Sequence, residues 1–342
     1  MQDIKELTSK ELEKALAAWK ESPYHCRQIL SWIYKKGVLD FGKMSDLSAA
    51  LRGRLKENFY ISALSLVERV SSADGTEKFL LRLKDGNLIE AVAIPAKGRL
   101  TGCISTQAGC RFACRFCASG AAGFKRNLSC AEIIEQLLFL NNPAENKLSH
   151  VVFMGIGEPL DNYENLLRGI RIINSAHAFN IGARRITIST CGIIPGIKRL
   201  SGEKLQIELS VSLHAGDDKI RSSLMPVNRK YPLKDLIAAC GEYIKNTRRQ
   251  VTFEYVLIKG INSDLQSAVN LSRILRGLRL CKVNLIPANY IPESKIEPPN
   301  KLGLLFFRDH LLKQGIKVTL RKPRGQDITA ACGQLRLRHE KK

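Results

Sequence analysis

From residue 101 onward the chain alternates short apolar segments of strand character with longer segments of helical spacing. Strands that alternate with helices in this way build a parallel sheet covered by those helices. The six strand-like segments read TGCIST, HVVFMG, RRITIST, QIELSVSL, VTFEYVLI and CKVNLIP. They predict an α/β fold in which the sheet curls into a partial, TIM-like (β/α)6 barrel over 99–322.

The rest of the chain follows other patterns. Residues 1–60 repeat apolar positions at helical spacing and predict a small helical module, whose last helix has Ser45 or Asp46 as a candidate cap. Residues 61–98 alternate as strands do and contain two Asp-Gly turn pairs, which predict a short antiparallel β extension. The segment 323–342 forms a C-terminal tail.

The composition indicates a cytoplasmic protein that meets a polyanion. The formal net charge is +22, from 54 Lys and Arg against 32 Asp and Glu, and such a surface attracts RNA. We find no apolar run long enough for a bilayer, and the N-terminal segment has no apolar centre typical of a signal peptide. Ten cysteines stay reduced in the cytoplasm, so metal binding or catalysis should explain some of them.

Three of those cysteines, Cys110, Cys114 and Cys117, directly follow the first predicted barrel strand. Ligands of parallel α/β folds sit at this end of the strands. Three thiolates can hold three corners of a 4Fe-4S cube and leave the fourth iron open to a small ligand. Zinc is the alternative, since the spacings also suit a tetrahedral site. Phe116, just before Cys117, favours the cube because the stretch then resembles the radical S-adenosylmethionine (SAM) signature.

Polar residues stand at the ends of further strands. The turn GIGEPL ends in Leu160, so it is not a dinucleotide fingerprint of the GxGxxG type. Its glutamate could accept hydrogen bonds from an ammonium group, although a Gly-Glu-Pro turn also simply ends a strand. Together these strand ends would form one rim suited to a ribose and a carboxylate, unless backbone groups satisfy them instead. The residues are Gly157, Glu158, Ser189, Thr190, Ser212, Leu213, His214 and Asn289.

Six stretches occur in an order that resembles the RlmN/Cfr family of radical SAM RNA methyltransferases. They are SADGTEKFLLRLKDGNLIEAVAIP, CISTQAGCRFACRFCASG, FMGIGEPLDN, RRITIST, SVSLHA and DITAACGQL. The resemblance runs from WIYKKGVLDF to Leu335 and includes two further cysteines, Cys103 and Cys332. It implies a radical SAM barrel, and a helical module that helps to bind RNA.

The resemblance also implies a role for each matching residue. Cys332 would carry the methyl group, Cys103 would be its disulfide partner, and Glu90 would accept a proton. The cysteine triplet would bind the cluster, with two SAM molecules used per turnover. The implied SAM contacts are Gly157, Glu158, Ser189, Ser212, Leu213, His214 and Asn289.

The implied chemistry answers a specific difficulty. The amidine carbons of adenine are electron-poor and do not attack the methyl group of SAM. In the family, one SAM methylates the thiolate of Cys332, and a radical from a second SAM activates that methyl group for addition to adenine. Loss of the ring proton then lets Cys103 displace the product. The implied partners are 23S ribosomal RNA, transfer RNA and a reductant such as flavodoxin or ferredoxin, with the enzyme a monomer.

Some positions depart from the family pattern. Tyr290 follows Asn289 where proline is usual, Gln326 replaces an acidic residue, and the loop IPESKIEPPNK differs. Pro159 and the RGQDI stretch favour methylation of adenine C2, as in the RlmN branch. The alternatives are C8 methylation, as in the Cfr branch, and a non-catalytic iron-sulfur protein that binds RNA, which would not need Cys103 or Cys332. The remaining cysteines are expected to be core residues without a role: Cys26, Cys130, Cys191, Cys240 and Cys281.

Overall fold

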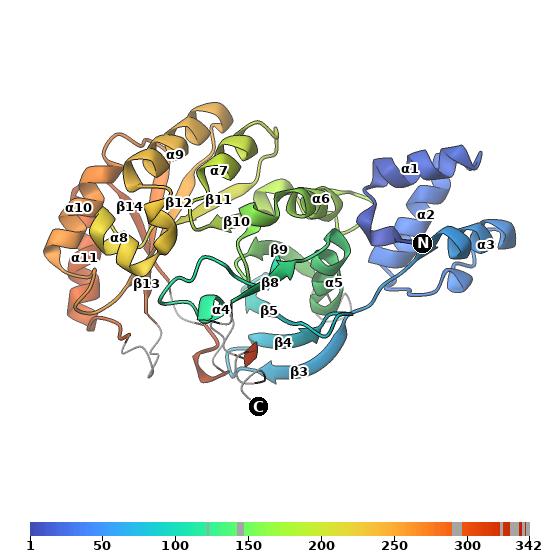
Figure 1. Cartoon of the computed structure of the whole chain (residues 1–342), viewed down its shortest axis with the longest axis horizontal. Coiled ribbons are helices and arrows are strands. Elements are labelled where there is room, and N and C mark those ends of the chain that lie inside the picture. Colours follow the sequence, from blue (N-terminus) through green and yellow to red (C-terminus); the bar gives the residue numbers. More distant parts are fainter. Residues whose placement is uncertain are drawn as a thin grey trace.

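The computed structural model of the chain describes residues 1–121, 123–141, 147–288, 296–321, 324–328, 335–336 and 339. One ten-stranded sheet forms its centre, in the order β14-β13-β12-β11-β10-β9-β6-β5-β4-β3 (Figure 1). Every neighbouring pair from β6 to β14 is parallel, which confirms the predicted fold class. The parallel strands are β6 (Arg99–Cys103), β9 (Leu148–Phe153), β10 (Ile186–Thr190), β11 (Glu208–Ser212), β12 (Val251–Leu257), β13 (Cys281–Pro287) and β14 (Lys317–Leu320).

The strands expected as a β extension continue this same sheet. β5 pairs antiparallel with β6, so the three antiparallel strands lengthen the barrel wall. Their turns lie at the two Asp-Gly pairs, where the glycines adopt positive φ. The three strands are β3 (Ser65–Ser71), β4 (Glu77–Arg82) and β5 (Leu88–Ala96).

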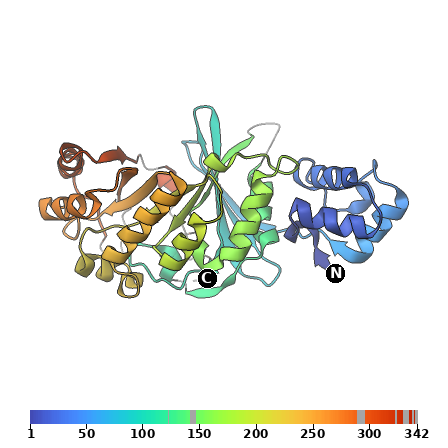
Figure 2. The same ribbon diagram turned by 90° about the horizontal axis from the view of Figure 1, so that it is seen from above.

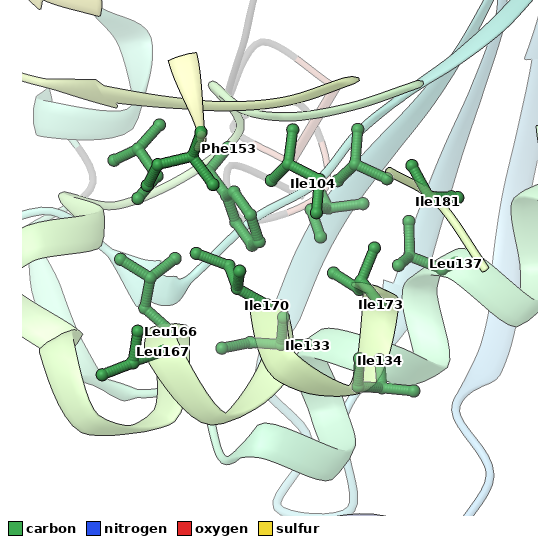
Figure 3. Packing of buried hydrophobic residues seen from close by; sticks show 14 of the residues in the cluster. Ile104, Ile133, Ile134, Leu137, Phe153, Leu166, Leu167, Ile170, Ile173 and Ile181 are labelled. Atoms are coloured by element: carbon green, nitrogen blue, oxygen red, sulfur yellow. The ribbon is translucent and has the colours of Figure 1, made fainter. Parts of the chain in front are cut away.

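Helices cover the outer face of the sheet, where the strands are apolar. Figure 3 shows Ile133 and Leu137 of α5 and Ile170 of α6 gathered against Ile104 and Phe153 of the sheet, and all five are fully buried or nearly so. The helical periods predicted α5, α6, α9 and α10 but not the others, since α7 contains Pro195 and α8 is short. The helices are α5 (Cys130–Leu140), α6 (Tyr163–Asn174), α7 (Ile194–Ser201), α8 (Asp218–Leu224), α9 (Leu233–Thr247), α10 (Leu265–Leu275) and α11 (Lys301–Lys313).

From β11 to β14 the inner face of the sheet carries a row of polar side chains. Partners across neighbouring strands project to the same face, and one such row contains Ser212, Glu254, Asn284 and Thr319. Most TIM barrels fill this space with branched apolar side chains. Short polar side chains leave it open instead, and two cavities lie along this face.

A helical module at the N-terminus lies beside the barrel (Figure 2). It contains β1 (Gln2–Asp3), α1 (Ser9–Ala18), α2 (Pro23–Tyr34), α3 (Ala49–Asn58) and β2 (Phe59–Tyr60). The expected cap of α3 was wrong. The cap is Ser48, whose hydroxyl accepts the backbone N–H of Leu51, whereas Asp46 accepts the indole N–H of Trp32.

A buried ion pair and a partly buried hydrogen bond fix the module to α5. The ammonium of Lys5 pairs with Glu135, with 0% and 5% of the two side chains exposed. The carboxylate of Glu6 accepts the backbone N–H of Ala131 at 2.9 Å, in the first turn of α5. Within the described residues, no helix is both long and apolar enough to cross a membrane.

Candidate active site

A two-stranded sheet that the sequence did not reveal holds the cysteine loop. β7 (Gln107–Gly109) pairs antiparallel with β8 (Phe124–Asn127). The loop between them carries the three cysteines and the short helix α4 (Ala118–Ala121). The backbone N–H of Cys110 donates to the carbonyl of Gly123 at 3.1 Å, so the loop closes on itself at its base.

The loop covers a cavity of about 280 Å³ at the carboxyl ends of the barrel strands. Both aromatic rings of the loop, Phe112 and Phe116, line the cavity with the three cysteines. The structure brings most of the sequence-predicted SAM residues to it, while Leu213 is buried outside its lining. Asn289 lies outside the described residues. The predicted residues in the lining are Cys110, Cys114, Cys117, Gly157, Glu158, Ser189, Thr190, Ser212 and His214.

The thiols fit an iron-sulfur cluster as ligands. Burial raises the pKa of Cys110 to about 12 and that of Cys114 further, and the nearby cysteines add to both shifts. Bare thiolates are therefore disfavoured, and bound iron would supply the missing positive charge. Among the described residues, no three His, Cys, Asp or Glu side chains converge as ligands of a single ion. A cube makes a different demand, since each cysteine binds a different iron.

Gly157 lets the turn after β9 pack onto β7. Its φ is +107°, and a Cβ there would lie 2.6 Å from the Cβ of Gln107. Gln107 is fully buried, and its side-chain amide joins three segments. It accepts the N–H of Glu158 and donates to Asn127 and Asp161, each at 2.8 Å. The cysteine loop and the Gly-Glu-Pro turn are thereby held in register.

The Glu158 carboxylate is buried at the cavity wall. One oxygen accepts the N–H of Leu160 at 3.0 Å and the other accepts the N–H of Cys191 at 2.7 Å. Burial raises its pKa, and the hydrogen bond from Cys191 opposes that rise. Glu158 thus caps its own turn. Its remaining lone pairs are free to face the cavity, and the contact with an ammonium group stays a prediction.

His214 presents a neutral imidazole at the cavity. Its Nδ1 accepts the backbone N–H of Val256 at 3.0 Å, which assigns the proton to Nε2. Burial and the nearby Arg221 lower its pKa to about 3. The ring stands edge-on to Phe116, with centroids 4.5 Å apart. His214 can thus donate a hydrogen bond without carrying charge.

Arg221 of α8 organises the strand ends, a function that sequence patterns did not indicate. Its fully buried guanidinium donates to the carbonyls of Cys191, Ser212 and Leu213. It also donates to Asn228 at 2.7 Å. Cys191, expected to be an ordinary core residue, is buried and lines the cavity. The sequence offered little signal for this role, because Arg221 is a basic residue in a short segment and such residues usually face solvent.

Glu90 and Cys103 lie on the same inner face, outside the cavity lining. Val92 of β5 is opposite Cys103 of β6, and Cys103 is opposite Val152 of β9. Glu90, two residues before Val92, therefore shares their face. Both Glu90 and Cys103 are buried, with 2% and 6% exposed.

The tail is anchored on either side of Cys332, which itself lies outside the described residues. Asp327 accepts the hydroxyl of Ser72 at 2.5 Å and the N–H of Ala73 at 3.0 Å, in the turn after β3. The backbone N–H of Arg336 donates to Glu90 at 2.7 Å. The tail therefore contacts the antiparallel part of the sheet at Asp327 and again at Arg336.

A second cavity, of about 420 Å³, lies along the inner face nearer the other ends of the strands. Met154, Glu254 and Arg321 line both cavities. Burial lowers the pKa of His150 in its wall, and Arg99 and Arg185 lower it further. The cavity is strongly basic. Five arginines line it, namely Arg99, Arg184, Arg185, Arg321 and Arg324.

Comparison with known families agrees with this geometry. Residues 104–271 match the radical SAM superfamily, and residues 2–61 match the ribosomal RNA large subunit methyltransferase N-terminal domain. A "Probable dual-specificity RNA methyltransferase RlmN" from Clostridium novyi (strain NT) is 46% identical over 98% of both chains. A protein of the same description from Thermoanaerobacter sp. (strain X514) is 45% identical, over 100% of this chain and 99% of its own.

A solved structure shows the same likeness in three dimensions. The crystal structure of a radical SAM methyltransferase from Sphaerobacter thermophilus superimposes with a TM-score of 0.92 at 44% identity. The match covers 98% of this chain and 99% of the other. Family membership implies a 4Fe-4S cluster rather than zinc at the cysteine triplet. With its cysteine loop, polar barrel lumen and full-length relatives, the chain belongs to the RlmN family of radical SAM RNA methyltransferases.

Proposed function

We propose that the protein methylates C2 of adenosine in 23S ribosomal RNA, and in transfer RNA, through a methyl group carried on Cys332. The observation that carries this proposal is the strand register from β5 to β9. It aligns Glu90 and Cys103 on the inner face that also lines both cavities. An acid-base group and a thiol thus lie on the same surface as the SAM residues.

The residues of this chain have separate tasks. Cys110, Cys114 and Cys117 hold the cluster, and the cavity below them holds SAM. When bound, cluster and SAM supply the methyl group and the radical, at a cost of two SAM molecules per turnover. Cys332 tethers the adenine, Glu90 takes the ring proton, and Cys103 forms a disulfide with Cys332 to release the product. Ser212 and Asn289 belong to the SAM contacts, the latter by resemblance.

The arginine-lined cavity supports an entry for RNA. Its five arginines line a cavity that shares Met154 and Glu254 with the cavity under the cysteine loop. Glu254, the acidic residue of its lining, accepts a hydrogen bond from Asn284 at 2.7 Å. Arginines bind phosphates without reading sequence. An adenosine that is flipped out of its RNA could enter here while its flanking phosphates remain at the rim. The N-terminal module would contribute further RNA contacts.

The remaining expectations concern the setting of the reaction. We propose a monomeric enzyme of the cytoplasm, reduced by a small electron carrier such as flavodoxin or ferredoxin. The strongly basic charge fits an RNA substrate and an acidic redox partner alike.

One experiment tests the reaction directly. The reduced protein is incubated with SAM and with unmodified 23S RNA or transfer RNA, and nucleosides from the digest are separated by mass spectrometry. We expect 2-methyladenosine, identified against authentic 2-methyl and 8-methyl standards. Appearance of 8-methyladenosine alone would assign the Cfr-type reaction instead. RNA that remains unmethylated, beside an intact cluster and intact SAM cleavage, would reject the function.

A further inference from the structure

A buried lysine contacts the carboxylate of Glu90. Lys78 lies on β4 and Glu90 on the neighbouring strand β5, with the Nζ of Lys78 2.8 Å from the Oε2 of Glu90. The side chains are 0% and 2% exposed. In the antiparallel register Lys78 is opposite Val92, and Glu90 is opposite Leu80. The two charges therefore face the inner side of the sheet among apolar neighbours.

Such a pair is costly to bury. Each ion loses several kcal/mol of hydration, on the order of what their mutual attraction returns. Two apolar side chains at these positions would pack as Leu80 and Val92 do, without this cost. Stability alone is thus a weak reason for the pair, and a chemical task is the stronger one.

The other carboxylate oxygen is also fixed. Its Oε1 accepts the backbone N–H of Arg336 at 2.7 Å, while the carbonyl of Glu90 accepts the hydroxyl of Ser105 at 2.6 Å. The carboxylate is therefore held at both ends, by β4 and by the tail that carries Cys332. Its position relative to the tethered substrate is set by these contacts.

The proton-transfer step of the proposed reaction gives the lysine beside Glu90 a chemical role. A buried carboxyl without a cation nearby favours its neutral form, which has no capacity to accept a proton. An adjacent ammonium favours the ionised form and orients it. In the proton-transfer step the C–H bond of the adenine carbon breaks, its electron pair stays with the ring, and the proton joins the carboxylate of Glu90. Nothing is oxidised or reduced in this step.

We propose that Lys78 is a positioning residue that holds the carboxylate of Glu90 and aims it at the tethered adenine. This inference rests on the proposed function, in which Glu90 accepts the ring proton. It adds a residue on β4, a strand that the resemblance assigned no role.

The test compares Lys78→Met, Lys78→Arg and Glu90→Gln in the full chain with its cluster. The rate at which RNA is released from its covalent adduct is measured in single turnovers across a range of pH. We expect Glu90→Gln to slow release on the order of a hundredfold. Lys78→Met should slow it about tenfold at neutral pH and require a higher pH for the same rate. Lys78→Arg should recover most of the loss, since it keeps the cation.

A second buried pair gives a matched control. Lys5→Met removes the cation opposite Glu135, far from the inner face. It should lower thermal stability and leave unchanged the rate, and the pH dependence of the rate, at which RNA is released from an adduct that has already formed. The double variant Lys78→Met, Glu90→Gln removes both charges, so it should regain stability while release stays slow.

The outcomes separate the two proposals. Slow release in Glu90→Gln, together with a parental rate and pH dependence in Lys78→Met, would overturn the role of Lys78 and leave the function intact. Parental release in Glu90→Gln would overturn both roles of the pair. If Lys5→Met shifted the pH dependence as Lys78→Met does, the effect would be one of general stability and the inference would fall.

Discussion

The guanidinium of Arg221 donates to the carbonyl oxygen of Cys191 at 2.7 Å, joining α8 to the end of β10. The same group reaches the carbonyls of Ser212 and Leu213 after β11. Neighbouring strand ends that line the cavity under the cysteine loop are thus tied together by one buried cation. Removing this cation has a predictable cost.

Arg221→Met should weaken both folding and SAM binding. Four acceptors would lose their donor in a buried site, so we expect a loss of at least about 3 kcal/mol in the free energy of unfolding. Denaturant titration and equilibrium dialysis with SAM measure the two effects. Lys219→Met, at an exposed position of the same helix, should change stability by no more than about 0.5 kcal/mol. Equal effects of the two variants would contradict the assignment.

The iron content of the protein should depend only on the three cysteines of the loop. Anaerobically purified protein should carry about four irons, and Cys110→Ala, Cys114→Ala or Cys117→Ala should lose them along with the brown colour. Cys130→Ala, in the buried face of α5, should retain the full iron content. Iron and sulfide analysis decides the matter, and stoichiometric zinc in active, iron-free protein would count against the cluster.

Cys103→Ala should trap the RNA on the protein. If Cys332 holds the adenine and Cys103 releases it, capture proceeds and release stops. Denaturing gels should show a slowly migrating species that nuclease removes, whereas the Cys103→Ala, Cys332→Ala variant should show none. An inactive but RNA-free Cys103→Ala protein with its cluster intact would exclude Cys103 from release.

His214 should make stability depend on pH. Its pKa of about 3 in the folded protein lies below the ordinary value of 6.5. Between these two pH values the unfolded chain therefore binds a proton at His214 that the folded protein does not bind. Stability is complete above pH 6.5 and should fall by about 1.4 kcal/mol per unit as the pH drops below it. His214→Asn, which keeps an acceptor for Val256, should flatten this slope. Stability is measured in anaerobic melts at pH 7 and pH 5. An equal loss of stability between these two pH values in the parent protein and in His214→Asn would refute the assignment.

The arginine-lined cavity should set the salt dependence of RNA binding. Arg99→Gln and Arg185→Gln should each reduce the slope of log affinity against log salt concentration by about 1. Arg273→Gln, on the exposed side of α10, should leave the slope unchanged. Fluorescence anisotropy with a labelled RNA hairpin measures all three. Unchanged slopes in the cavity variants would place the RNA elsewhere.

Local patterns were enough to predict the barrel and the position of the cysteine loop. Alternating periods define β9 to β13 and the helices α5, α6, α9 and α10, and ligand loops follow parallel strands by geometry. The pairing of Lys78 with Glu90 was beyond such reasoning, because it depends on the register between two strands. The burial of Arg221 was equally hidden, since α8 is too short to show a clear apolar face. Asn289 and Cys332 lie outside the described residues, so their expected roles stay predictions.

The joint between the N-terminal module and α5 has a consequence for substrate choice. Lys5 forms a buried ion pair with Glu135 of α5, and the carboxylate of Glu6 accepts the backbone N–H of Ala131 in the first turn of the same helix. If the module moved away from α5, one charge of this buried pair would lose its partner. A hinge at this point is therefore unfavourable. The distance between the module and the barrel is then fixed. On the proposed function, in which the module contacts RNA, an RNA would have to bring its adenosine to the barrel at that fixed spacing, and its own folded shape would have to supply the fit.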